Sequence, residues 1–148
     1  MSTTLQEAPI VSNESNIILE IRSLFDHYAS VFIDLVLGKR TDIDKLFDYF
    51  STPLRIIAPT FHRVIMDNPS MIDQNALGGE IKRLQQAGLA SSTLEKCQIS
   101  VISPAAALVD TIWLRHDNAG SLIAKIGVAY FVTKTAEGWR ITSVINTF

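Results

Sequence analysis

Four strand-like segments joined by short turns fill the second half of the chain, and this arrangement limits the possible folds more than any other feature. Strands are predicted at Leu94–Ile102, Ala106–His116, Leu122–Thr133 and Trp139–Phe148. The turns at 117–120 and 135–138 each contain a glycine, and neither is long enough for the crossover that parallel strands require. The last three strands are therefore predicted to be antiparallel neighbours in one sheet.

The first half of the chain is predicted to be mainly helical. Apolar side chains recur at steps of three and four from about Asn16 to Leu37, which predicts a first helix that ends at Gly38. A short second helix follows, and a third is predicted from Asn68 to about Ala87. Gly78 and Gly79 lie inside the third helix, where each glycine costs about 1 kcal/mol relative to alanine. Close packing against that helix would explain them.

These elements indicate one α+β domain. A length of 148 residues fits a single domain. Residues 1–13 are polar and aperiodic and are predicted to be a flexible arm, which leaves residues 14–148 for the fold. Two more short strands are predicted at Leu54–Ala58 and Phe61–Met66. The predicted architecture is a set of three N-terminal helices packed on a long, bent sheet.

Composition and the lack of known motifs exclude several classes of function. Apolar residues make up 47% of the chain and charged residues 19%, and the net charge is −2. Neither a disordered chain nor a nucleic-acid partner is therefore expected. The sequence has no signal peptide and no apolar run of about 18 residues, so a cytoplasmic protein with no membrane partner is predicted. Three scattered histidines, one cysteine and no phosphate-binding motif predict a protein without metal or cofactor.

Three segments near the C-terminus carry a family resemblance: ALVDTIW at 107–113, YFV at 130–132 and EGWRI at 137–141. Together with the order of elements over residues 15–148, they resemble the nuclear transport factor two-like superfamily, which includes ketosteroid isomerase-like proteins and SnoaL-like polyketide cyclases. The resemblance implies a cystatin-like cone, in which helices close the concave side of a strongly curved, mainly antiparallel sheet around a pocket. Because the superfamily contains enzymes, carriers and assembly domains, the fold does not specify the function.

The isomerase resemblance can be checked at the residues that carry that chemistry. Ketosteroid isomerases use a tyrosine and a neutral aspartic acid as hydrogen-bond donors, together with an aspartate base. Tyr28 matches the tyrosine of the first helix. The base position falls near Ile57-Ala58-Pro59 and the second aspartate near Ala129, and neither place holds a carboxylate. Steroid isomerisation by that mechanism is therefore not expected.

Asp110 is the most informative polar residue of the predicted strands. Alternation places it on one strand face with Leu108, Ile112 and Leu114. A carboxylate among apolar neighbours is costly unless it is paired, and its pKa is sensitive to that environment. Asp110 is therefore predicted to be a catalytic or ligand-binding group at the pocket wall. An ion pair with a basic residue such as Arg115 is the structural alternative.

Four other residues complete the predicted site. Tyr28 and His62 are the predicted catalytic partners of Asp110, because a hydroxyl or an imidazole can move or hold a proton. Tyr28, Tyr130 and Trp113 are predicted to contact the ligand along with Asp110. The alternatives are ordinary structural roles, namely core packing for the aromatic residues and solvent exposure for the histidine.

The leading hypothesis is a protein that binds a small organic ligand in a mostly apolar pocket. The alternatives are a cofactor-independent isomerase, cyclase or hydratase that uses Asp110, and a non-catalytic dimerisation or assembly module. Apolar residues also occupy both faces of the strand Ala106–Leu114. Because helices can cover only one face of a curved sheet, a twofold homodimer is predicted to cover the other.

Overall fold

The computed structural model describes residues 10–148, and its helices precede most of the sheet in the sequence. They are α1 (Ile10–Val36), the 3₁₀ helix η2 (Ile43–Asp48), α2 (Asn68–Met71) and α3 (Leu77–Gln86). Helix α1 begins inside the segment predicted to be an arm, so residues 10–13 belong to the helix, and residues 1–9 lie outside the described part. Gly38 follows α1 with a φ of 76°, as predicted for the residue that ends it. None of the described helices is long and apolar enough to cross a membrane.

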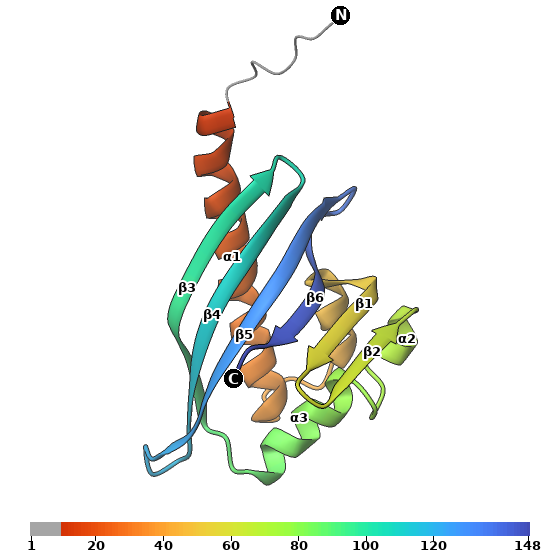
Figure 1. The fold of residues 1–148 in the computed structure, drawn as a ribbon. Coiled ribbons are helices and arrows are strands. Elements are labelled where there is room, and N and C mark those ends of the chain that lie inside the picture. Colours follow the sequence, from red (N-terminus) through yellow and green to blue (C-terminus); the bar gives the residue numbers. More distant parts are fainter. Residues whose placement is uncertain (1–9) are drawn as a thin grey trace, which may run out of the picture.

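The six strands of the described residues form one curved sheet (Figure 1). They are β1 (Phe50–Ala58), β2 (Phe61–Ile65), β3 (Ser91–Ser103), β4 (Ala106–His116), β5 (Leu122–Thr135) and β6 (Gly138–Asn146). Their order across the sheet is β2-β1-β6-β5-β4-β3. Neighbouring strands are antiparallel except β1 and β6, which are parallel. The predicted antiparallel run of β4, β5 and β6 is confirmed.

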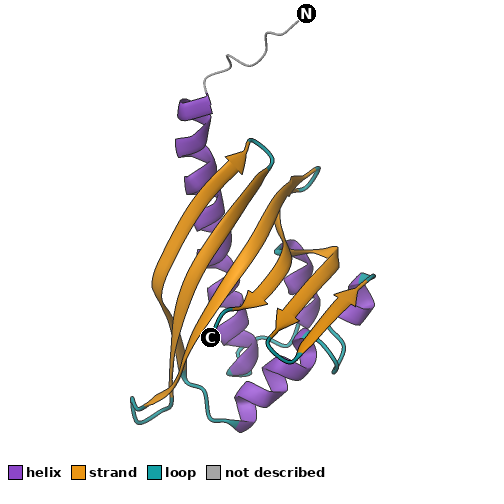
Figure 2. Ribbon diagram, in the orientation of Figure 1, coloured by secondary structure: helices purple, strands orange, loops and turns teal. Residues whose placement is uncertain are grey.

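In the part of the chain that the structure describes, helices cover the concave face of the sheet and no element covers the convex face (Figure 2). Strand β4 shows the difference between the two faces. Ala107 and Val109 are buried, whereas Leu108 between them is 43% exposed. The buried side packs against the apolar side of α1, which includes the fully buried Phe25. The predicted α+β class, with helices on one side of a bent sheet, is confirmed.

The predicted third helix is interrupted, and its two glycines lie at the interruption. Turns over residues 72–76 separate α2 from α3, so the prediction of one continuous helix from Asn68 to Ala87 is wrong. A Cβ atom on Gly78 would collide with the carbonyl oxygen of Ile72, and a Cβ atom on Gly79 would collide with that of Gln74. The close packing expected at these glycines is therefore present, and it comes from the turn that immediately precedes them.

Replacing Gly79 with alanine tests this close packing. Alanine is the better helix former by about 1 kcal/mol, but its methyl group would overlap the carbonyl of Gln74. Because overpacking typically costs about 1–3 kcal/mol, we expect Gly79→Ala to lower the free energy of unfolding measured by urea denaturation. Gln86→Ala at the exposed end of α3 is the control and should change it by less than about 0.5 kcal/mol. A Gly79→Ala protein more stable than the wild type would contradict the packing argument.

Candidate functional site

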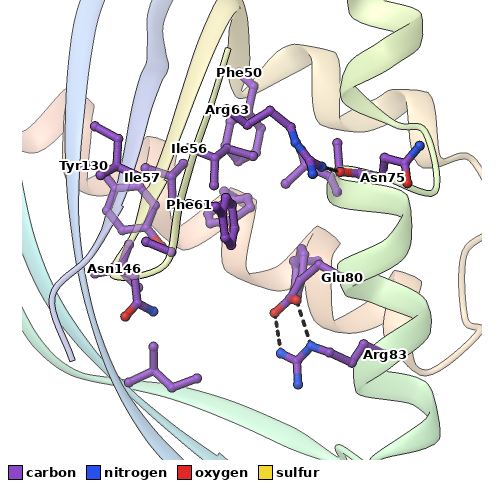
Figure 3. Close-up of a pocket in the computed structure, with 18 of the residues that line it drawn as sticks. Phe50, Ile56, Ile57, Phe61, Arg63, Asn75, Glu80, Arg83, Tyr130 and Asn146 are labelled. Carbon is purple, nitrogen blue, oxygen red and sulfur yellow. Dashed lines mark hydrogen bonds and ion pairs between the residues drawn. The ribbon is translucent and has the colours of Figure 1, made fainter. Parts of the chain in front are cut away.

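A cavity of about 320 Å³ lies between the concave face of the sheet and the helices α1 and α3 (Figure 3). Its volume is near the lower end of the range of about 300–1,000 Å³ that is usual for small-molecule sites. Aromatic side chains form much of its wall, namely Tyr28, Phe32, Phe50, Phe61 and Tyr130. Aliphatic residues complete the apolar lining, namely Ile56, Ile57, Ala58, Ala76, Leu77, Ile126, Val128 and Val144. The cavity is therefore mostly apolar and of a size for a small molecule.

Two buried tyrosines contribute hydroxyl groups to the cavity wall. The oxygen of Tyr130 accepts a hydrogen bond from the Trp113 indole Nε1 at 3.1 Å, and it lies beside the Tyr28 hydroxyl. Burial raises the pKa of Tyr28 well above its usual value and raises the pKa of Tyr130 to about 12. Both tyrosines therefore keep their protons at neutral pH. They can act as hydrogen-bond donors but not as anionic bases.

Helix α3 brings an acidic residue and a basic residue to one side of the cavity, and β4 adds a second arginine. The Glu80 carboxylate accepts two hydrogen bonds from the Arg83 guanidinium, at 3.0 and 2.7 Å (Figure 3). One of its oxygens also lies 3.5 Å from Nη1 of Arg115 at the end of β4. The Arg115 side chain is 13% exposed, and its buried Nε has no hydrogen-bond partner among the described residues. Glu80 thus pairs with Arg83 within α3 and links α3 to the sheet through Arg115.

Arg63 on β2 adds a third arginine to the cavity lining. Its guanidinium donates a hydrogen bond to the carbonyl oxygen of Asn75, just before α3 (Figure 3). Its Cζ atom lies 5.7 Å from the centre of the Phe61 ring, which is a cation–π distance. The lining therefore contains three arginines and, among the described residues, a single carboxylate, that of Glu80.

Asp110 lies on the convex face of the sheet and does not reach the cavity. Its carboxylate pairs with Lys96 at 2.9 Å, and about half of each side chain is exposed. In the strand register Asp110 is opposite Gln98 and Ala129, which places all three on the convex face. The prediction that Asp110 forms part of the pocket wall is therefore wrong. The strand face that it shares with Leu108 is the one that the helices leave uncovered.

His62 and Trp113 also lie outside the cavity lining. The residues on either side of His62 line the cavity, and alternation along β2 turns His62 to the other side. Its Nε2 lies 3.1 Å from Nη1 of Arg55. Trp113 lies behind the wall and supports it through the hydrogen bond to Tyr130. Of the predicted site residues, Tyr28 and Tyr130 are the two that the structure brings to the cavity.

The charged group of Glu80, Arg83 and Arg115 was missed by sequence reasoning. One signal could have found Arg115, because it continues the alternation of Val109 and Trp113 along β4 and so belongs to the same inner face. No comparable signal exists for the contact between Glu80 and Arg115. Their meeting depends on how α3 lies across the sheet, which the periodicity of neither element specifies.

The cavity offers hydrogen-bond donors more readily than a base. Ile57 and Ala58 line it at the place where the isomerase resemblance puts the catalytic base, and neither residue can ionise. Glu80 is already held by two guanidinium groups. Groups of three or more histidine, cysteine or acidic side chains that could hold a metal ion do not occur within residues 10–148. The arrangement is suited to binding a polar or anionic group next to an apolar one.

A family model for NTF2-like proteins, DUF6841, matches residues 19–147. The chain belongs to this family. Because the match covers nearly the whole described structure, it confirms the resemblance to the nuclear transport factor two-like superfamily. No curated protein matches the sequence of this DUF6841 member.

Solved structures similar to this DUF6841 protein share its cystatin-like fold. An NTF2-like superfamily protein from Salmonella enterica serovar Typhimurium is 19% identical, with a TM-score of 0.61 over 90% of this chain and 92% of that chain. An NTF2-like protein from Novosphingobium aromaticivorans is 14% identical, with a TM-score of 0.66 over 99% and 90%. A protein from Shewanella frigidimarina, provisionally named a ketosteroid isomerase, is 17% identical, with a TM-score of 0.56 over 89% and 92%. At these identities the likeness establishes the fold alone.

The pH dependence of stability tests the burial of Tyr130. Its pKa is about 12 in the folded protein, whereas a tyrosine in an unfolded chain has a pKa near 10. Between these pH values the unfolded chain has lost a proton that the folded protein keeps. The contribution of the protonated Tyr130 to the free energy of unfolding is therefore complete below about pH 10, and it is lost as the pH rises toward about 12. We expect the free energy of unfolding, measured by urea denaturation at each pH, to fall more steeply in this interval for the wild type than for Tyr130→Phe. Equal slopes would show that Tyr130 is not buried as described.

Proposed function

We propose that this protein binds a small organic molecule in the cavity between α1, α3 and the sheet. The observation that supports this most is an open volume of about 320 Å³ with aromatic walls and a few polar residues in its lining. Such a combination is typical of ligand sites, in which apolar walls supply affinity and polar groups orient the ligand. An assembly module would have no need to keep this space free of side chains. A cytoplasmic location, which the sequence predicts, is compatible with this role.

The state of the polar groups favours binding over acid–base catalysis. A general base needs a free lone pair within reach of the proton that it takes, but the Glu80 carboxylate accepts two hydrogen bonds from Arg83 and lies near Arg115. Tyr28 and Tyr130 keep their protons because burial raises their pKa. These hydroxyls suit a role in orienting a polar atom of the ligand. The provisional name of the Shewanella frigidimarina protein therefore supports only a shared fold and does not extend to isomerase chemistry.

We further propose that the convex face of the sheet forms a twofold homodimer. Leu108 and Phe131 are neighbours in the register of β4 and β5, and Ile112 and Ile145 lie on the same face. The charges on this face include Lys96, which pairs with Asp110 within the chain, so a second copy would meet little like-charge repulsion there. A face that is apolar and internally neutralised is suited to self-association about a twofold axis.

A substitution that fills the cavity tests the proposed binding. Val144 lines the cavity from β6, so Val144→Trp places an indole in the space that the ligand would occupy. Two measurements apply: native mass spectrometry for a retained small molecule, and calorimetric titration with the neutral aromatic probe 2-naphthamide. We expect the wild type to bind and Val144→Trp to lose at least about tenfold in affinity, because the apolar contact area is already occupied.

Val64→Trp is the matched control for this experiment. Val64 lies on β2, is 40% exposed and is not part of the cavity lining. The Val64→Trp protein should retain the affinity of the wild type for 2-naphthamide, since the added ring extends into solvent. Unchanged binding by Val144→Trp would mean that the probe binds elsewhere, and no binding by the wild type would count against a ligand-binding role.

The dimer proposal is tested by placing a charge on the convex face. Leu108→Lys would bury an unpaired ammonium group from each copy in the proposed interface, which is costly. We expect the wild type to sediment as a dimer at micromolar concentration and Leu108→Lys to shift toward the monomer. Leu19→Lys changes an exposed leucine on α1 and should leave the oligomeric state unchanged. A wild type that sediments only as a monomer would refute the proposal.

A further inference from the structure

The cavity concentrates positive charge in a protein whose net charge is negative. Arg63, Arg83 and Arg115 all line it, and Glu80 is the one carboxylate among the described lining residues. The whole chain has a net charge of −2, so this excess of arginine is local to the cavity and does not reflect the composition. Arginine side chains are mostly exposed in folded proteins, and a nearly buried one usually has a binding or pairing partner.

Of the three arginines that line the cavity, Arg115 has the least complete set of hydrogen-bond partners. Its side chain is 13% exposed, and its contact with Glu80 is 3.5 Å, longer than an ordinary charge-assisted hydrogen bond. Glu80 in turn makes its two short hydrogen bonds to Arg83, at 3.0 and 2.7 Å. The Nε of Arg115 is buried without a partner among the described residues. A guanidinium in this position is costly to keep unless a further acceptor enters the cavity.

The lining is also divided into two sides. The α3 side presents Glu80 and Arg83, and Arg63 of β2 and Arg115 of β4 reach this side through their contacts with Asn75 and Glu80. Tyr130 and Ile57 lie on the opposite side, along the sheet (Figure 3). An occupant that matches both sides must itself be amphipathic, with one charged end and an apolar body. The cavity volume of about 320 Å³ limits that body to a small ring system or a short branched chain.

We infer that the ligand is a small amphipathic carboxylate, whose carboxylate is bound by Arg115 and Arg83 and whose apolar body lies among the aromatic side chains. This inference rests on the proposed ligand-binding function and names its chemical class. A planar carboxylate matches the fork of N–H donors that a guanidinium presents. A monoanion is favoured over a phosphate ester, because a second negative charge would add to the cost of desolvation in a mostly apolar cavity and to repulsion by Glu80.

The test compares an acid with its neutral amide of nearly the same shape. Calorimetric titration at pH 7 would be carried out with 2-naphthoate, 2-naphthamide and 2-naphthyl phosphate. We expect 2-naphthoate to bind at least about tenfold more tightly than 2-naphthamide, the factor that one charge-assisted hydrogen bond supplies. We also expect it to bind more tightly than 2-naphthyl phosphate.

Two substitutions should change the preference for 2-naphthoate over 2-naphthamide in opposite directions. Arg115→Met removes the guanidinium and is expected to weaken 2-naphthoate by about tenfold or more and 2-naphthamide by clearly less, because the neutral amide makes only an ordinary hydrogen bond to a guanidinium. Glu80→Gln removes the competing carboxylate and is expected to tighten 2-naphthoate by about twofold or more. Arg22→Met, which changes an exposed arginine paired with Asp26 on α1, is the matched control and should alter neither affinity.

The possible results separate this inference from the proposed function. If 2-naphthamide binds as tightly as 2-naphthoate, the cavity binds ligands but the inference of a carboxylate is wrong. If 2-naphthyl phosphate binds most tightly, the anion has been assigned to the wrong class. If none of the three compounds binds the wild type, the proposed function itself fails. Should Arg115→Met not fold, Arg83→Met and Glu80→Gln still decide whether the arginines select for the anion.

Discussion

The packing of aromatic side chains between α1 and the concave face of the sheet is the contact on which the rest of the structure depends. The ring centres of Phe25 and Tyr130, on α1 and β5, are 4.8 Å apart. The ring centres of Tyr28 on α1 and Phe50 on β1 are 5.2 Å apart, and both pairs have edge-to-face geometry. Such pairs stabilise one relative orientation of their elements as well as burying area. Because these contacts join α1 to distant strands, they determine how much of the concave face the helix covers and where the cavity begins.

The charged residues of the cavity lining have a cost in stability. A buried arginine that is imperfectly paired is less favourable for stability than an apolar residue of similar size. Arg115 is therefore expected to lower the stability of the fold. Glu80 offsets part of this cost and also joins α3 to the end of β4. The same contact therefore positions a helix and neutralises part of the positive charge in the cavity lining. A fold of this kind can vary its ligand by changing these few side chains while the aromatic contacts of α1 keep the architecture.

The elements that could be predicted from the sequence are those whose pattern is local. Strand β4 was predicted with the bounds that the structure has, Ala106–His116, because alternation and flanking turns define both of its ends. The interrupted third helix was missed, because the carbonyl groups that surround Gly78 and Gly79 belong to a turn that leaves no periodic signal. The sequence also contained no indication that β1 pairs in parallel with β6.

The candidate site was predicted less well than the fold, because the sequence does not show which face of β4 points toward the helices. Alternation along β4 separates Asp110 from Trp113 correctly, but both of the resulting faces are apolar, and the pattern does not say which face the helices cover. Choosing the face of Asp110 placed the pocket on the wrong side of the sheet, so Arg115 was considered only as an ion-pair partner of Asp110. The burial of Trp113 and the uncovered position of Leu108 settle this choice only once the sheet has been assembled.

The place of β6 between β1 and β5 has a consequence for the order in which the protein can assemble. Before residues 138–146 are available, β1 and β2 can pair only with each other, and an isolated two-stranded hairpin is marginally stable in water. The early strands therefore remain separated from the β3–β4–β5 meander until the last strand is synthesised and inserts between them. Long-range pairings of this kind slow folding. During synthesis, β1 thus lacks its parallel neighbour until residues 138–146 have emerged, which is a period when chaperones would be of use to the protein.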